Sequence, residues 1–315
     1  MAKIRTSDIF LLALSNFVFA TGWSAIKHPQ DQMGPVVLNL WTLGLSIPVL
    51  LPFAIAEYRA RTTPSPPLSL RLAWHYFAMG VFGLTGMTLL YNLGARLSLA
   101  ANGALIAMCV PVMTALIAAI VLGERLTKGK GLSLLTAIVG VLIISDLDWN
   151  TVGFFGPYLS GNILLLAGAV GNAVYVVYAK KLLMHTGPMV VLFWGQVFGF
   201  AGSIPFLLVE PTGGQGPLAY TGTTWLSLVF LGSVYFGLTM VVFCRILDRM
   251  EAGKIMVFAY LQPVFGVAMS ALLLGERITF SMVIGGLLVV AGTSLVLREE
   301  HTSSEPAGAV AARDL

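Results

Sequence analysis

One phrase in this sequence occurs twice. The 17 residues PVMTALIAAIVLGERLT, Pro111 to Thr127, return 152 residues later as PVFGVAMSALLLGERIT, Pro263 to Thr279, with eight of the 17 positions identical. Five of these eight are Pro, Gly, Glu, Arg and Thr, which an apolar background does not match by default. The phrase therefore predicts an internal duplication, and a duplication limits the possible folds more than any single motif does.

The match extends on both sides of the phrase. The further matched pairs are Gly80 and Gly232 and Ala100 and Ala252 at an offset of 152, and Lys27 and Lys180, Gly34–Pro35 and Gly187–Pro188, Trp41 and Trp194, and Pro52–Phe53 and Pro205–Phe206 at 153. The change of offset predicts one insertion or deletion between residues 53 and 80. We predict a first repeat over residues 1–148, a second over 149–297, and a polar, disordered cytoplasmic tail over 298–315.

The composition places this duplication in a membrane. The chain of 315 residues is 57% hydrophobic and only 10% charged, against about 25% charged in soluble proteins. The formal net charge of +4 is scattered in short clusters between apolar runs, so we predict no nucleic-acid partner. Both cysteines, Cys109 and Cys244, fall inside apolar runs, where a disulfide framework has no role.

A membrane crossing needs about 20 apolar residues, and ten such runs can be counted. They are centred near Phe17, Ser46, Gly83, Val110, Ile138, Gly168, Phe198, Val234, Pro263 and Val289. The first run, Ile9 to Ile26, lacks a small-residue cleavage site at its end, so we expect a span and not a cleaved signal peptide. With the N-terminus inside, 15 Lys and Arg residues lie on the inner side, and only Lys27, Arg96 and Arg277 lie outside. This bias predicts that both termini are cytoplasmic.

Ten spans in two repeats give five spans to each repeat. Because five is odd, the second repeat must enter the membrane from the opposite side to the first. The predicted fold class is therefore an all-α integral membrane protein of ten transmembrane helices, built as two inverted-topology five-helix repeats. Such repeats, related by a pseudo-two-fold axis in the membrane plane, are typical of secondary transporters.

This plan resembles the drug/metabolite transporter superfamily. The Pro-x11-Gly-Glu-Arg phrases that close spans four and nine are similar to those of its EamA branch, and GWSAIK, Gly22 to Lys27, is similar to the end of that branch's first span. The resemblance covers Asp8 to about Leu297, nearly the whole chain. It implies a carrier of amino acids or other small metabolites, with export as the usual direction, and it does not select a substrate.

Two prolines indicate where the transport site lies. Inverted-repeat transporters bind substrate near the bilayer midplane, often beside helices that proline or glycine interrupts. Pro111 and Pro263 lie about halfway along spans four and nine, where each frees a backbone carbonyl one turn earlier, around Ala107 and Ala259. We predict that both are helix kinks or hinges. The alternative is the ordinary tolerance of membrane helices for proline.

Polar and aromatic residues share helical faces around this level. The candidate cavity residues are Asn16, Phe19, Trp23, Thr85, Thr88, Asn92, Met108, Asn172, Tyr175, Tyr235, Thr239, Tyr260 and Gln262. A polar amide in hydrocarbon needs a partner, so these faces should point to a cavity or to another helix. Each individual Asn, Thr or Tyr could equally hold two helices together, and Trp23 could be an interface anchor.

Other residues are expected to be structural. Gly195 and Gly199 on span seven, and Gly80, Gly83 and Gly86 on span three, favour close helix packing. Gly123 and Gly275 are expected to end their helices. Glu124 and Glu276 are predicted to lie near the surface, where they anchor the helix in the headgroups or pair with a neighbouring span, and not to bind substrate.

The missing residue types narrow the function. No Asp or Glu lies in the middle of a predicted span, which favours facilitated diffusion or exchange over strong proton coupling. The motifs GxxxxGK[ST], HExxH and GxSxG are absent, so we predict no cofactor, no metal site, no catalytic residues and no enzyme.

The prediction is a transporter in the bacterial inner membrane. It exports small neutral or zwitterionic metabolites, first of all amino acids, by alternating access. Its partners are the small-molecule substrate and the lipid bilayer, and it is a monomer or homodimer. The alternatives are a carrier of drugs or other amphiphilic metabolites, and an intramembrane lipid-modifying enzyme.

Overall fold

The computed structural model describes residues 6–60, 70–98, 106–144, 156–208, 210, 216–274 and 280–300, and every regular element in these ranges is a helix. Each of the ten predicted span centres lies inside one of them. The continuous helices are α1 (Thr6–Gln30), α2 (Pro35–Ala60), α6 (Cys109–Leu122), α7 (Lys128–Ile144), α8 (Leu159–Leu183), α9 (Pro188–Ser203) and α14 (Phe280–Glu300). Short 3-10 turns lie at η2 (Gly156–Tyr158), η3 (Ile204–Leu208) and η4 (Pro217–Ala219).

In the described ranges, three further predicted spans consist of several helical pieces, and we keep the predicted span numbers as labels. Span three is α3 (Leu70–Phe77), η1 (Ala78–Thr85) and α4 (Gly86–Leu97). Span eight is α10 (Gly222–Val229), η5 (Phe230–Thr239) and α11 (Met240–Arg249), and span nine is α12 (Ala252–Val257), η6 (Phe258–Tyr260) and α13 (Leu261–Leu274). Of the predicted tail, residues 298–300 belong to α14, and the remainder lies outside the described residues.

Within the described ranges, five helical stretches are long and apolar enough to cross a membrane: Pro35–Ala60, Leu72–Gly94, Leu159–Leu183, Pro188–Leu208 and Gly222–Arg249. Shorter apolar helices cover Thr6–Gly22, Cys109–Leu122 and Val283–Leu295. Large apolar side chains such as Ile120, Leu135 and Leu287 expose more than half of their surface. Such a surface needs lipid around it, so the chain is a membrane protein.

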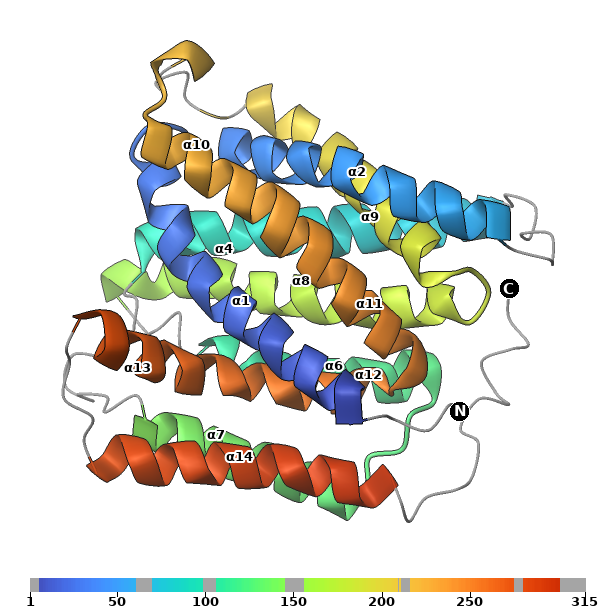
Figure 1. Ribbon diagram of the computed structural model, residues 1–315, viewed down its shortest axis with the longest axis vertical. Coiled ribbons are helices and arrows are strands. Elements are labelled where there is room, and N and C mark those ends of the chain that lie inside the picture. The colour runs from blue at the N-terminus through green and yellow to red at the C-terminus, as the bar shows by residue number, and fades with distance from the viewer. Residues whose placement is uncertain are drawn as a thin grey trace.

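The helices pack across the two repeats (Figure 1). The pair α7 and α14 lies side by side at one edge of the bundle, and α2 and α9 pack together at the opposite edge. Helices α4 and α8 lie between these edges, and α1 and the continuous run of α10 and α11 cross the face nearest the viewer. Since α7 corresponds to α14 and α2 to α9 in the repeat, each of these helices packs on its own counterpart.

Reciprocal carboxylate caps tie α2 to α9. Glu57, near the end of α2, accepts the backbone N–H of Met189 at the start of α9 at 2.7 Å. Glu210, two residues after the 3-10 turn η3 that follows α9, accepts the N–H of Val36 at the start of α2 at 2.9 Å. Glu57 and Glu210 are 153 residues apart, as are Val36 and Met189, so the two caps are equivalent contacts. The helices are therefore antiparallel, and each carboxylate satisfies amide groups that a helix N-terminus leaves free.

Spans three and eight contain π-helical segments at equivalent positions, because η1 and η5 begin 152 residues apart. A Cβ atom on Gly83 would lie 2.8 Å from the Cα of Tyr175 on α8, and one on Gly80 would lie 2.9 Å from the backbone nitrogen of Gly199 on α9. The predicted close packing at these glycines is confirmed. Segments of π-helix are rare and recur at functional positions.

Spans four and nine are interrupted just before their prolines. Helix α6 begins at Cys109 after a turn at Met108, and η6 separates α12 from α13 up to Tyr260. Pro111 and Pro263 follow each interruption by three residues. A proline cannot donate to the carbonyl four residues earlier, which explains why the regular helix changes at this level. The prediction that Gly123 ends its helix is confirmed, because Gly123 caps α6 with a φ of 68°.

Candidate functional site

The two interruptions touch each other. The hydroxyl of Tyr260 donates a hydrogen bond of 2.8 Å to the backbone carbonyl of Met108, and both residues are buried. Met108 and Tyr260 are 152 residues apart, which makes them equivalent positions of the two repeats. The contact therefore lies where the repeats meet, and it joins the broken part of span four to the broken part of span nine.

An amide pair lies close by in the sequence. Two residues after Tyr260, the Nε2 of Gln262 donates to the Oδ1 of Asn16 on α1 at 3.1 Å. The Nδ2 of Asn16 donates in turn to the carbonyl of Leu12 at 2.9 Å. The pair joins α1 of the first repeat to α13 of the second.

Aromatic rings follow on the same face of α1. Phe19 lies one turn beyond Asn16 and packs edge-on against Tyr235 of η5, with ring centroids 5.0 Å apart, and also against Phe243 at 6.2 Å. One turn further, Gly22 lies so close to the Tyr235 ring that a Cβ atom there would overlap it. A glycine at this position therefore lets α1 approach η5.

Tyr91 of α4 completes this group, although it is not among the residues predicted from the sequence. Asn172 of α8 forms a side-chain hydrogen bond with Tyr91, and a Cβ on Gly168 would lie 3.2 Å from the Tyr91 ring. Tyr91 and Tyr235 both pack against the same hydrophobic core. Tyr91 lies one turn after Thr88 and next to Asn92, both predicted cavity residues, and this position is the feature of the sequence that indicates it. We call Asn16, Tyr91, Asn172, Tyr235, Tyr260 and Gln262 the central cluster.

Other predicted site residues lie in helix-packing contacts. The Thr85 hydroxyl donates to the carbonyl of Gly199 on α9 at 2.6 Å, and Ser203, on the same face of α9, accepts a hydrogen bond from Asn39 of α2. Tyr175 is buried with its backbone against Gly83. These contacts connect spans two, three, six and seven.

The remaining predicted residues divide as follows. Thr88 donates to the carbonyl of Leu84 within its own helix. Thr239 is buried at the end of η5, and Asn92 is half-buried on α4. Trp23 belongs to the backbone of α1, but its side chain lies outside the described residues. None of these four is tied to the central cluster by a described hydrogen bond.

Gln196 of α9 is a second residue that the sequence analysis passed over. Its Nε2 donates to the carbonyl of Phe236 in the π-helical segment η5 at 3.1 Å. Its Oε1 is buried and has no hydrogen-bond partner within the described part of the chain. A buried acceptor without a donor is costly, so this oxygen is open to a water or a ligand. Gln196 lies between Gly195 and Gly199, which were interpreted as residues of close helix packing, so it was not predicted as a site residue.

This arrangement is that of a membrane carrier: an apolar helical bundle, two equivalent sets of broken helices, and a polar, uncharged cluster between them. A family model agrees, because the EamA-like transporter family matches the chain twice, over residues 6–146 and 159–298. The chain belongs to the EamA-like transporter family. The resemblance predicted from the Gly-Glu-Arg phrases is thereby confirmed, as is the prediction of a transporter and not an enzyme.

Two similar proteins have names that concern amino acids. A probable amino-acid metabolite efflux pump of Salmonella typhimurium is 28% identical over 297 residues, covering 90% of this chain and 93% of the relative. A probable terminal-alkyne amino-acid exporter of Streptantibioticus cattleyicolor is 26% identical over 295 residues, covering 92% and 93%. One solved crystal structure has a TM-score of 0.76 at 21% identity and covers 96% of this chain and 100% of its own, which shows the same fold.

Proposed function

We propose that this protein exports small neutral or zwitterionic metabolites, with amino acids as the first substrate class, by alternating access. The observation that carries the proposal is the central cluster at the meeting point of the two repeats. Two of its residues, Tyr260 and Gln262, lie where span nine is interrupted, and Tyr260 contacts the interruption of span four. The sites of inverted-repeat transporters lie beside such interrupted helices. Substrate would bind there and be released to either side as the repeats move.

The chemistry of the cluster favours an uncharged or zwitterionic substrate. Its side chains are amides and phenols, and amides can both donate to a carboxylate and accept from an ammonium group. The rings of Phe19, Tyr235 and Phe243 provide apolar area for a side chain and a face for an ammonium group. Two relatives whose names concern amino acids support the same class.

The second candidate is a carrier of drugs or other amphiphilic metabolites. The same three rings favour it, since a large apolar ligand would use them more than the amides. The family match gives no support to the third alternative, an intramembrane lipid-modifying enzyme.

We propose ten crossings with both termini in the cytoplasm of a bacterial cell, with the protein in the inner membrane. The caps between α2 and α9 support the pairing of sides in this topology, and the Lys and Arg distribution supports which side is cytoplasmic. Glu57 and Met189 are both on the side that the Lys and Arg distribution assigns to the cytoplasm, and Glu210 and Val36 are both on the other side. A bacterial relative such as the Salmonella protein supports the location.

We also propose exchange or facilitated diffusion as the mode of transport, because the predicted spans contain no central carboxylate. In proteoliposomes, an imposed pH gradient should not drive an amino acid above its equilibrium level. Accumulation well above that level would contradict this part of the proposal.

A thermal-shift panel on the purified protein tests the substrate class directly, because a ligand of the folded state raises its apparent stability. We expect aromatic and branched amino acids to raise the apparent Tm and sugar phosphates to leave it unchanged. At a concentration of 100 Kd, the stabilisation is about 2.7 kcal/mol. A shift with sugar phosphates alone would contradict the proposed class, and a shift with amphiphilic drugs alone would select the second candidate.

A further inference from the structure

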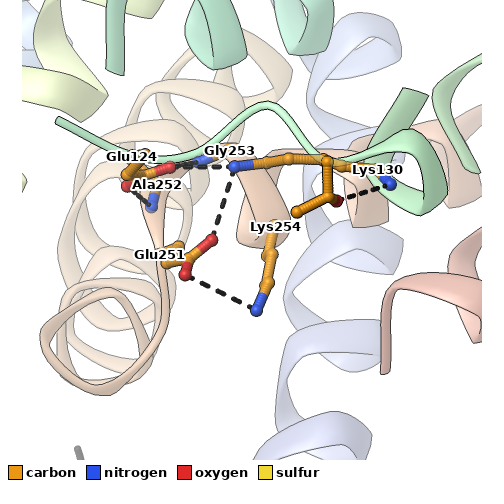
Figure 2. A network of polar contacts seen from close by, with 7 residues as sticks. Glu124, Lys130, Glu251, Ala252, Gly253 and Lys254 are labelled. Atoms are coloured by element: carbon orange, nitrogen blue, oxygen red, sulfur yellow. Dashed lines mark hydrogen bonds and ion pairs between the residues drawn. The ribbon is translucent and has the colours of Figure 1, made fainter. Parts of the chain in front are cut away.

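A buried network of charges ties the two repeats together where spans eight and nine meet (Figure 2). Glu124, which follows α6, accepts the backbone N–H of Ala252 at 2.7 Å through Oε1 and that of Gly253 at 3.1 Å through Oε2. These amides open helix α12 of the second repeat. A carboxylate of span four therefore caps the first turn of span nine.

Lys130 of α7 passes between the carboxylates. Its Nζ lies 3.0 Å from the Oε2 of Glu124 and 3.4 Å from the Oε2 of Glu251, and the residue is only 1% exposed. Lys254 lies 3.5 Å from the other oxygen of Glu251. We call Glu124, Lys130, Glu251 and Lys254 the inner latch; two of its residues come from each repeat.

The outcome for Glu124 corrects part of the sequence analysis. Glu124 was predicted either to anchor its helix in the headgroups or to pair with a neighbouring span. It does pair with a neighbouring span, but it is 6% exposed and therefore buried, not at the surface. The left-handed Gly123 turns the chain at the end of α6 and so directs the following residue inward. A Cβ on Gly253 would lie 2.5 Å from the Cε and Nζ of Lys130, so a larger residue there would displace the ammonium group from its present position.

Further charged groups hold the same corner, residues 247–254. The Nζ of Lys180 on α8 donates to the carbonyl of Leu247 at 2.6 Å and to that of Asp248 at 2.9 Å. Arg249 pairs with Asp8 of α1 at 3.3 Å. The corner between spans eight and nine is thus held from α1, α8 and the α6–α7 connection at once.

We propose that the inner latch is the cytoplasmic gate of the transport path, closed in this structure. The proposal rests on the proposed function and on the proposed orientation, which puts the 247–254 corner in the cytoplasm. Substrate in the central cluster can reach the cytoplasm beside α12 only after Glu124 releases Ala252 and Gly253. The closed gate is a contact between the repeats, so relative movement of the repeats opens it.

Charges suit a gate better than an apolar plug does. A buried ion pair gives up hydration when it forms, and its net contribution to stability is small even when its geometry is good. On opening, the four charges regain water, so the open and closed states can lie close in free energy. An apolar contact of the same size would instead expose its surface to water in the open state. A carrier needs both states populated.

The caps between α2 and α9 provide the contrast. Both are formed in the same structure, one at each end of the pair. To separate at either end, α2 and α9 would have to break the cap at that end. We therefore expect these two helices to remain together as a scaffold. Glu57 is therefore a matched control: it also caps a second-repeat helix on the same side, but it is not part of the latch.

Accessibility of Cys109 tests the gate without any substrate. Cys109 is exposed at the start of α6, at the opposite end of that helix from Glu124, whereas Cys244 is buried. In a Cys244→Ala background, a membrane-impermeant maleimide is applied to the cytoplasmic face of inside-out vesicles. We expect Glu124→Gln and Lys130→Met to label about tenfold faster than Glu57→Gln. Equal labelling rates in all three variants would overturn the proposal.

A milder variant and a crosslink complete the test. Should Lys130→Met not fold, Glu251→Gln, at the more exposed edge of the latch, takes its place with the same expected direction. A disulfide in Glu124→Cys/Ala252→Cys should stop transport until a reductant is added, whereas one in Glu57→Cys/Met189→Cys should not. Transport by the crosslinked latch would overturn the gate. Fast labelling of the latch variants without transport of any amino acid would leave the gate standing and would contradict the proposed function.

Discussion

The hydroxyl of Tyr260 donates to the carbonyl of Met108, its own equivalent in the other repeat. A contact between equivalent positions lies close to the pseudo-two-fold axis that relates the repeats. The contacts of a gate, which lie far from that axis, change when one side opens and the other closes, but a contact on the axis can persist. We therefore expect this hydrogen bond to act as a pivot about which the broken spans four and nine move.

Removing only the Tyr260 hydroxyl tests the pivot. Tyr260→Phe keeps the ring and deletes the hydrogen bond to Met108. We expect a loss of about 1 kcal/mol in stability, and a fall in transport of up to about tenfold if that free energy is lost in one state only. Uptake in proteoliposomes, corrected for the amount inserted, measures the fall. Tyr58→Phe, on an exposed ring at the end of α2, is the control, and an equal change there would contradict the role of Tyr260.

The Asn16–Gln262 amide pair should behave as one unit. Asn16→Ala and Gln262→Ala each remove the same hydrogen bond, so their effects on substrate affinity and stability should not add. A double-mutant cycle is expected to give a coupling free energy of about 0.5 to 2 kcal/mol. Additive effects would mean that the two amides act separately, whatever their distance in the structure.

Gly83 and Gly86 lie on the same span but should differ sharply when changed to alanine. A Cβ on Gly83 would lie within 3 Å of the Tyr175 backbone, while the nearest atom to one on Gly86 is 3.7 Å away. We expect Gly83→Ala to cost about 1 to 3 kcal/mol or more, and Gly86→Ala less than about 0.5 kcal/mol. Thermal unfolding followed by fluorescence-detected size exclusion measures both. Equal Tm values would show that spans three and six pack less closely than described.

The caps of α2 and α9 should be equivalent in energy as well as in position. Glu57→Ala and Glu210→Ala each leave amides at a helix N-terminus without an acceptor, at a cost of about 1 kcal/mol. Asp31→Ala, in an exposed turn, is the control. A stable Glu210→Ala protein with an unchanged Tm would indicate that this cap adds nothing to the α2–α9 pair.

Much of the fold could be predicted because it depends on periodic features of the sequence. Apolar runs of sufficient length predicted ten positions that all lie in helices. The repeated phrase predicted a duplication, and the family model matches the chain twice. The equivalence of Glu57 and Glu210 was missed, although their offset of 153 is present in the sequence. A cap is formed between helices of different repeats, and no local pattern around Glu57 shows which helix end its carboxylate reaches.

The candidate site could be predicted only as a set of faces. A helical face containing Asn16 and Phe19 shows that both point the same way, but it does not show what they meet. The partners Gln262 and Tyr235 lie more than 200 residues away in the chain. For the same reason Thr85 could not be distinguished from Asn172: both are polar groups in hydrocarbon, and only the packing shows that Thr85 donates to Gly199. The burial of Lys130 depends on a partner carboxylate, which hydropathy does not reveal.

Counterflow in proteoliposomes tests the central claim most directly, since only a carrier with alternating access exchanges labelled for unlabelled substrate. Vesicles preloaded with an unlabelled neutral amino acid should take up the labelled form transiently. Tyr260→Ala and Asn172→Ala, inserted in equal amounts, should reduce the initial rate of this uptake by about tenfold or more. That reduction corresponds to at least about 1.4 kcal/mol. If no neutral or zwitterionic amino acid shows counterflow, or if both variants exchange at the wild-type rate, then the central cluster is not the transport site for this class of substrate.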